Sequence, residues 1–295
     1  MANAMPAAET DISVELVQAL LDEQHSDLAD RELRFENNGW DSAIFRLGED
    51  LAVRLPRRKV NADLLPDELQ WLPRLAPQLP LPINAPVRVG VPGCGFPWMW
   101  SIAQWFHGAS WADAEVRDPH ETATTFGWFV RELGVDAPDD APNNPYRGGP
   151  LTDRDPALRE RVTQLGASID ADAVVGLWDD ALAAPMNTRR RWLHGDLHPA
   201  NIIVNGGQIA AIVDWVDLSA GDTAYDLAAA WFCFSDPSAR AVFIDATGET
   251  DEATWVRARA CALSHAIACL ASSADNPRMH AVGQRTLDAV VSTSL

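Results

Sequence analysis

Residues 192–215 read WLHGDLHPANIIVNGGQIAAIVDW, and this stretch decides the fold class. Two apolar runs, 202–204 and 209–213, flank the tetrapeptide NGGQ at 205–208. A Gly-Gly pair at the centre of a two-residue loop suits a type I′ turn, because both central residues of that turn need a positive φ. The stretch is therefore predicted to form a β-hairpin.

The register of this hairpin brings two polar side chains to one face. Pairing residue 205 with residue 208 places Asn201 opposite Ile212, and Asp214 lies two residues further along the same strand. Because side chains alternate along a strand, Asn201 and Asp214 share a face as diagonal neighbours, about 7–8 Å apart. Amide and carboxylate oxygens are hard ligands that suit Mg²⁺, which completes its shell with water and phosphate. We predict that the two residues bind one magnesium ion.

Asp196 lies five residues before Asn201, in a loop that begins with His194-Gly195. A carboxylate at that place can accept a proton from an attacking hydroxyl or orient the hydroxyl. A lone Asp or His in a loop is usually a turn or capping residue, so the prediction depends on the whole ordered pattern. A catalytic aspartate followed by two magnesium ligands is typical of protein kinases. The pattern therefore predicts phosphoryl transfer with Asp196 as the catalytic residue.

The segment HGDLHPANIIV, followed by IVDWVDLSAGDTAYDLA, resembles the aminoglycoside phosphotransferase family, which shares the protein-kinase-like fold. The resemblance implies the same roles for Asp196 and for the two magnesium ligands. It also implies that His198 and His194 brace the loop rather than take part in the chemistry. Asp222 and Asp226 match positions that hold the catalytic segment together, although helix capping would explain them equally well.

Elsewhere the pattern of apolar residues changes from mainly strand-like in the first third of the chain to mainly helical in the rest. Residues 31–56 alternate apolar runs with turns and predict an antiparallel meander, followed by a strand at 87–91 and another before the linker. Helical periodicity is expected at 11–24, 66–75, 118–134, 156–165, 171–184, 223–234, 251–273 and 276–291. The stretch APNNPYRGGPL at 141–151 is rich in Pro, Gly and Asn and is expected to be a surface loop. The fold class is therefore α+β, a two-lobed protein-kinase-like fold with a small antiparallel β-rich N-lobe and a larger helical C-lobe. Residues 1–106 are expected to form the nucleotide-binding lobe with its linker, and residues 107–295 the catalytic and acceptor-binding lobe.

A nucleotide-binding lobe of this kind has a basic residue on its third strand and an acidic partner on the next helix. Arg54 in LAVRLPRR and Glu68 on the helix that follows meet that description, with Arg where protein kinases have Lys. A guanidinium can hold phosphate through two parallel hydrogen bonds. The alternatives are a strand-edge charge for Arg54 and a solvated helix face for Glu68. Arg57 is expected at the surface.

Two further segments match nucleotide-contacting parts of the family. The turn NNGWDS at 37–42 resembles the loop over the phosphates, where Ser42 offers a hydroxyl, but it lacks a Gly-rich motif and an ordinary hairpin turn explains it equally well. The run SIAQWFHG at 101–108 matches the inter-lobe linker, whose backbone bonds the purine edge in this family. The resemblance thus implies nucleotide contacts at Gln104 and Phe106, and it leaves ATP and GTP equally suitable. Gly108 permits the chain to turn into the second lobe.

Composition excludes several other classes of protein. A net charge of −19 argues against nucleic acid as a partner and is compatible with a cationic acceptor, although an acidic surface also simply keeps a protein soluble. We find no secretory signal and no membrane-spanning run, so we expect a cytoplasmic monomer or dimer without a membrane partner. The four cysteines lack zinc-site spacing and are expected to be reduced core residues.

The acceptor is the part that the sequence leaves open. A polycationic aminoglycoside would need carboxylates, such as those of Asp217, Asp236, Asp251 and Glu252, although each alone is more often a surface charge. A macrolide would need an apolar wall, which Trp231, Phe232, Phe234 and Trp255 could form, although they are more often core residues.

We therefore predict a phosphotransferase that moves the γ-phosphoryl group of ATP or GTP, with Mg²⁺, to a hydroxyl of a small molecule. The acceptor is expected to be an antibiotic such as an aminoglycoside or a macrolide. The alternatives are a kinase of metabolites such as sugars or amino alcohols, and a kinase-fold protein that binds nucleotide without turnover.

Overall fold

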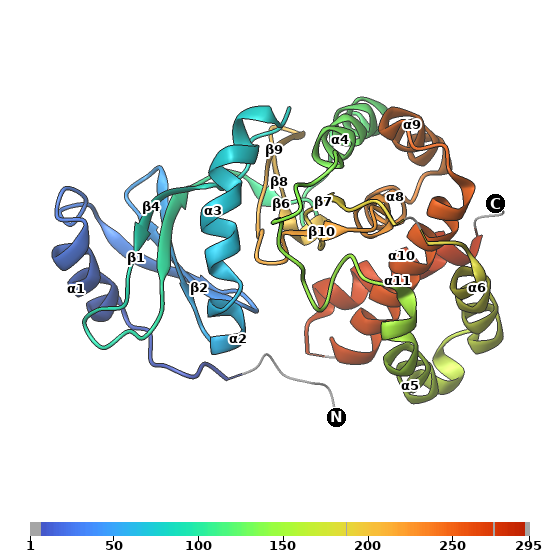
Figure 1. Cartoon of the computed structure of the whole chain (residues 1–295), viewed down its shortest axis with the longest axis horizontal. Helices are drawn as coiled ribbons and strands as arrows, with labels where there is room; N and C mark the ends of the chain where they lie inside the picture. Colours follow the sequence, from blue (N-terminus) through green and yellow to red (C-terminus); the bar gives the residue numbers. More distant parts are fainter. Residues whose placement is uncertain (1–6, 187, 274, 293–295) are drawn as a thin grey trace. The chain divides into compact units, whose positions relative to one another are not determined.

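The computed structural model describes residues 7–186, 188–273 and 275–292. These residues divide into two compact units (Figure 1). The N-terminal unit contains residues 7–107 together with 211–216, and the C-terminal unit contains 108–210 together with 217–292. The segment 192–215 therefore begins in the C-terminal unit, and its last residues, from 211 onward, belong to the N-terminal unit.

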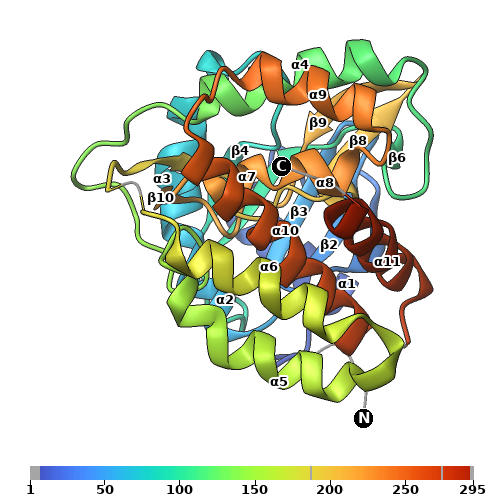
Figure 2. The ribbon, with the colours of Figure 1, turned by 90° about the vertical axis from the view of Figure 1, so that its right-hand side faces the viewer.

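The C-terminal unit is built around one long buried helix, α10 (Glu252–Ser272). It packs against α5 (Asp155–Leu165), α6 (Ala171–Ala183), α7 (Ala224–Leu227) and α11 (Pro277–Ser292), as Figure 2 shows. Most side chains of α10 are buried all round the helix, as expected of a helix enclosed by others. Helix α4 (Pro119–Leu133) pairs with α9 (Pro237–Thr247), and α8 (Ala229–Cys233) joins α7 to α9.

Short strands carry the catalytic segment. Strand β7 (Arg191–Leu193) pairs with β10 (Ser219–Gly221), and β6 (Ala109–Ser110), β8 (Ile202–Asn205) and β9 (Gln208–Ile212) form a second sheet. Gly206 and Gly207 have φ values of 59° and 80°, so the predicted hairpin turn is confirmed. The end of β9 belongs to the N-terminal unit, because Ile212 donates its amide to the carbonyl of Pro82 at 2.9 Å.

The N-terminal unit contains a five-stranded sheet in the order β1-β2-β3-β5-β4, in which all neighbouring strands are antiparallel. Its strands are β1 (Leu33–Asn38), β2 (Ser42–Leu47), β3 (Leu51–Pro56), β4 (Pro86–Gly90) and β5 (Trp100–Gln104). Its helices are α1 (Val14–Gln24), α2 (Lys59–Ala62) and α3 (Leu65–Leu75). The predicted meander is thus confirmed, as is the α+β class with an antiparallel β-rich N-terminal part and a helical C-terminal part.

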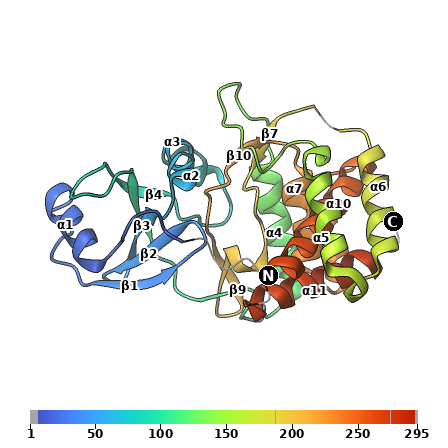
Figure 3. The same ribbon diagram turned by 90° about the horizontal axis from the view of Figure 1, so that it is seen from below.

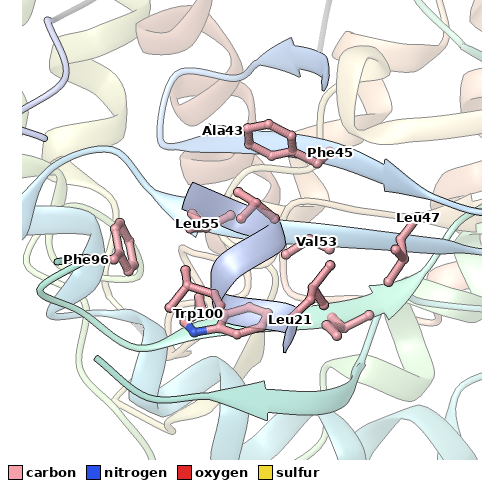
Figure 4. Close-up of a cluster of buried hydrophobic side chains, with 11 residues drawn as sticks. Leu21, Ala43, Phe45, Leu47, Val53, Leu55, Phe96 and Trp100 are labelled. Carbon is pink, nitrogen blue, oxygen red and sulfur yellow. The ribbon is translucent and has the colours of Figure 1, made fainter. Parts of the chain in front are cut away.

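One face of this sheet forms the core of the N-terminal unit. Helix α1 lies beside the strands in Figure 3, and its Leu21 packs with Phe45 and Trp100 in the cluster of Figure 4. Because side chains alternate along a strand, Val53 points into this cluster and Arg54 points to the opposite face. The core therefore fixes the direction in which Arg54 projects.

Several expectations were wrong in detail. The helix expected at 223–234 is broken into α7 and α8, and α9 was not predicted. The loop at 141–151 is not simply a surface loop, since Ala141 and Asn144 are buried. Cys94 is exposed and bonded to Glu23 rather than lying in the core. No helix in the described residues is both long and apolar enough to cross a membrane.

We predict that Gly108→Ala destabilises the protein. Gly108 has a φ of +142°, and an added Cβ would lie 2.3 Å from the carbonyl oxygen of Val204 in β8, a backbone atom that cannot move aside. We expect the free energy of unfolding in urea to fall by at least about 2 kcal/mol. Gly176→Ala in α6, where the added Cβ has open space, is the control and should be neutral or slightly stabilising. Equal stabilities of the two variants would contradict the prediction.

Candidate active site

The catalytic loop follows directly from β7 and is held from behind by Asp226. The two carboxylate oxygens of Asp226 accept the backbone N–H groups of His194 at 2.7 Å and Gly195 at 2.9 Å. His194 is fully buried, and its Nδ1 accepts the amide of Asp196 at 3.2 Å. Asp226 lies within α7 rather than at its N-cap, and it fixes the backbone that precedes Asp196.

Asp196 is held by residues of its own unit, its side chain by Arg147 and His198 and its main chain by Asn201. Its Oδ1 accepts a hydrogen bond from Nη2 of Arg147 at 2.9 Å. Its Oδ2 lies 3.2 Å from Nε2 of His198, while Nδ1 of His198 accepts the amide of Ala200 at 3.2 Å. Asn201 donates its Nδ2 to the main-chain oxygen of Asp196 at 3.0 Å. His198 thus braces the loop, as the resemblance implied.

These contacts set the charge of Asp196. Burial alone would raise its pKa, but the positive charge of Arg147 and the interaction with His198 outweigh that and hold the pKa well below its usual range. The carboxylate is therefore ionised at neutral pH. It can accept a hydrogen bond from a hydroxyl, and its weak basicity suits orientation better than early proton removal.

The residues predicted to bind magnesium offer the right kind of donor atoms. Asn201 uses its amide N–H groups on Asp196, and among the described residues its Oδ1 has no hydrogen bond, which leaves an oxygen for a metal. Asp214 ends the hairpin with a φ of +66°, a strained conformation that Asp tolerates better than most residues. An amide oxygen and a carboxylate fit Mg²⁺. Asn201 and Asp214 belong to different compact units, so their joint binding of one ion stays a prediction.

The N-terminal unit pairs Arg54 with Glu68. The two side chains form a direct ion pair and are only 8% and 1% exposed, so the alternatives of a strand-edge charge and a solvated helix face are wrong. Nη2 of Arg54 also lies 3.7 Å from Oδ1 of Asp214. Burial would lower the pKa of Arg54, but Glu68 and Asp214 outweigh it and raise the pKa, so the guanidinium stays charged. A buried, anchored cation of this kind can hold a phosphate group.

The other residues predicted to contact nucleotide lie at the start of β2, at the end of β5 and just beyond β5. The carbonyl of Ser42 accepts the amide of Gly39 at 2.9 Å and closes the turn between β1 and β2. Arg57 is buried, contrary to expectation, and donates to the carbonyl of Gly39 at 3.3 Å. Gln104 is exposed at the end of β5, and Phe106 is half-buried beyond it. Their contacts with a nucleotide stay predictions.

Sequence reasoning missed the cationic side of the site. Arg147 comes from the loop at 141–151 and also binds Oδ2 of Asp217 through Nε at 3.1 Å. His265 of α10 places Nδ1 3.8 Å from Oδ1 of Asp196, and burial lowers the pKa of His265 to about 3. Burial raises the pKa of Asp217, and the charges of Arg147 and Arg154 offset this only in part. The Pro- and Gly-rich pattern predicted a loop, but it gave no signal that this loop reaches Asp196.

Comparison with protein families identifies the family of the chain. The family model described as "Phosphotransferase enzyme family" matches residues 32–261, a range that includes Arg54, Asp196, Asn201 and Asp214. The chain belongs to this family. As a member of the phosphotransferase enzyme family it is a small-molecule kinase, which confirms the predicted class of enzyme.

Solved structures of this family share the fold of the chain. The GDP complex of wild-type aminoglycoside 2'-phosphotransferase-IIIa is 19% identical, with a TM-score of 0.71 over 95% of this chain and 99% of that one. Macrolide 2'-phosphotransferase MphH from Brachybacterium faecium, as the apoenzyme, is 21% identical, with a TM-score of 0.60 over 96% and 99%. At these identities the likeness shows the fold alone. No curated protein sequence matches the chain significantly.

We predict that Asp226→Asn loosens the catalytic loop. An amide offers one oxygen where the carboxylate offers two, so either His194 or Gly195 loses its acceptor, at a cost of about 1–3 kcal/mol. Phosphoryl transfer should fall with it. Asp245→Asn on the exposed surface of α9 is the matched control and should change stability by less than about 0.5 kcal/mol.

The same variant has an expected pH dependence. Burial raises the pKa of Asp226 to about 7, although the amides of Gly195 and His194 lower it in part. Between the unfolded pKa of about 4 and this value, the folded state holds a proton that the unfolded state has lost, so wild-type stability falls as pH rises. The amide that replaces the carboxyl group in Asp226→Asn cannot titrate, and the stability gap between wild type and variant should be smaller at pH 8 than at pH 5. Urea titrations that give a constant gap would contradict this.

Proposed function

We propose that this enzyme transfers the γ-phosphoryl group of ATP or GTP to a hydroxyl of a small molecule, with Asp196 orienting that hydroxyl. The observation that carries the proposal is the environment of Asp196. Its carboxylate is ionised, its backbone is held by Asp226, and its side chain is braced by His198. A fixed, charged acceptor of this kind positions a nucleophile for in-line attack.

The remaining residues are proposed to handle the phosphates. Arg54, anchored by Glu68, binds phosphate oxygens in the N-terminal unit. Asn201 and Asp214 would hold Mg²⁺, which neutralises phosphate charge when it is bound. In phosphoryl transfer, positioning and charge neutralisation supply most of the acceleration, so little proton removal is asked of Asp196.

The proposed acceptors are antibiotics of the aminoglycoside or macrolide type, in which case the enzyme would confer resistance. Support comes from the solved relatives, one of which is described as the GDP and kanamycin complex of APH(2")-IIia. That structure has a TM-score of 0.69 and 20% identity over 93% of this chain and 97% of that one. A sugar or amino-alcohol kinase of the cytoplasm is the second candidate. Binding without turnover is less well supported, because Asp196, Asn201 and Asp214 are all present.

Asp196→Ala should abolish transfer and spare nucleotide binding. We expect turnover to fall about a thousandfold, because the acceptor hydroxyl loses its orienting group. The measurement is a coupled nucleotide-consumption assay across aminoglycosides, macrolides, sugars and amino alcohols with ATP and GTP, with Asp245→Ala as the control. Near wild-type turnover by Asp196→Ala on a confirmed acceptor would refute the assignment.

A thermal shift with ATP or GTP, with and without Mg²⁺, tests nucleotide binding separately. Ligand at a hundred times its dissociation constant should add about 2.7 kcal/mol, in wild type and in Asp196→Ala alike. If neither nucleotide stabilises wild type in a magnesium-dependent way, the proposed function fails.

Glu68→Gln should weaken nucleotide binding. Removing one partner of a buried ion pair costs about 3–5 kcal/mol and leaves Arg54 without its anchor. We expect a lower melting temperature and a KM for nucleotide raised at least about tenfold. Glu49→Gln removes an exposed carboxylate from Arg46, which the backbone carbonyls of Gly48 and Glu49 still hold, and should do neither. Equal KM values for the two variants would argue against the role of Glu68.

A further inference from the structure

A guanidinium bridges the carboxylate of Asp196 and that of Asp217. Nη2 of Arg147 lies 2.9 Å from Oδ1 of Asp196, and its Nε lies 3.1 Å from Oδ2 of Asp217. Asn144 donates to the other oxygen of Asp217 at 2.8 Å and holds that carboxylate in place. All four residues belong to the C-terminal unit. The carboxylates of Asp196 and Asp217, which an acceptor cation could otherwise bind, therefore already share the guanidinium of Arg147.

The backbone around Arg147 is built to hold the side chain there. The carbonyl of Gly148 accepts the amide of Asp222 at 3.0 Å, which fastens the loop beside β10. A Cβ on Gly221 would lie 2.4 Å from the oxygen of Gly148, and a Cβ on Gly195 would lie 3.0 Å from Cγ of Arg147. Only glycines permit these approaches. The backbone of this loop thus holds Arg147 between β10 and the catalytic loop.

A second guanidinium adds positive charge on the same side. Nε of Arg154 donates to the hydroxyl of Tyr225 at 3.1 Å, and its charge acts on Asp217. Within the described part of the chain, no carboxylate lies within 4.0 Å of the Arg154 nitrogens. Arg154 therefore adds to the positive charge that Arg147 brings to Asp217.

We infer that Arg147 determines acceptor specificity, by selecting hydroxyl compounds that carry no positive charge beside the reacting hydroxyl. An acceptor ammonium group near Asp196 would have to displace Arg147 from both carboxylates or lie against it as a like charge, and either is unfavourable. Uncharged polyols meet no such obstacle. The inference rests on the proposed function and, among its candidate acceptors, ranks an uncharged one such as a sugar above the polycationic aminoglycosides.

The test compares binding of one scaffold with and without its charges. Kanamycin and its fully N-acetylated derivative carry the same hydroxyls, but only kanamycin is polycationic. Calorimetry at low salt should show that wild type binds kanamycin no more tightly than the acetylated form. Arg147→Gln frees Asp196 and Asp217, so its affinity for kanamycin should exceed that of wild type at least about tenfold. Its affinity for the acetylated form should change less than about twofold.

Two further variants serve as controls. Arg159→Gln removes a guanidinium that pairs with Asp155 and Asp179, and should alter neither affinity. Arg147→Lys keeps the charge and should keep the wild-type ranking. A folded Arg147→Gln variant without the gain in kanamycin affinity would overturn the inference. So would wild type that binds kanamycin at least about tenfold more tightly than the acetylated form, a result that needs no variant.

These measurements need no turnover. Failure of the proposed function would instead appear as nucleotide binding that does not respond to Mg²⁺, with the ranking of kanamycin and its acetylated form unaffected. The two failures are therefore distinguishable.

Discussion

The carboxylate of Asp226 is the contact on which the active site depends. The backbone N–H groups of His194 and Gly195 are buried between β7 and the catalytic loop, and without an acceptor each would carry a large desolvation cost. Asp226 satisfies both at once, although burial raises its pKa to about 7. Because Asp226 binds the backbone amides of His194 and Gly195, the side chain of Asp196 is not needed to stabilise the loop. Its two oxygens face Arg147 and His198 and, in the proposed function, the acceptor hydroxyl.

Much of the fold follows from local patterns in the sequence. The Gly206-Gly207 turn needs two positive φ angles, and the meander of β1, β2 and β3 alternates as strands do. Arg54 and Glu68 were paired from their places on a strand and the next helix, and the core beneath the strand explains why Arg54 projects towards α3. The start of α9 also has a local signal, since Asp236 is its N-cap and Pro237 its first residue, a pattern typical of a helix N-terminus.

The cationic side of the site had no such signal. Arg147 meets Asp196 across 49 residues of sequence, through a pairing of the three-residue strands β7 and β10 that is too short to show periodicity. The contact also needs Gly148 and Gly221 to approach within the space of a missing Cβ. The contact, the strand pairing and the glycine approach all arise only when segments far apart in the sequence pack together. A loop composition rich in Pro, Gly and Asn predicted the absence of regular structure, but it could not predict which side chain the loop delivers.

Net charge describes the whole chain and does not describe its active site. A value of −19 for the whole chain is compatible with a cationic acceptor, yet charge at the catalytic carboxylate is set by the few groups within bonding distance. Two of the carboxylates considered for an acceptor site, Asp236 and Asp251, instead cap α9 and α10 by accepting backbone amides. A third, Asp217, is bound by Arg147 and Asn144. The carboxylates of Asp196 and Asp217 thus share the guanidinium of Arg147, and their charges are partly compensated inside the protein, which the net charge of the chain does not reveal.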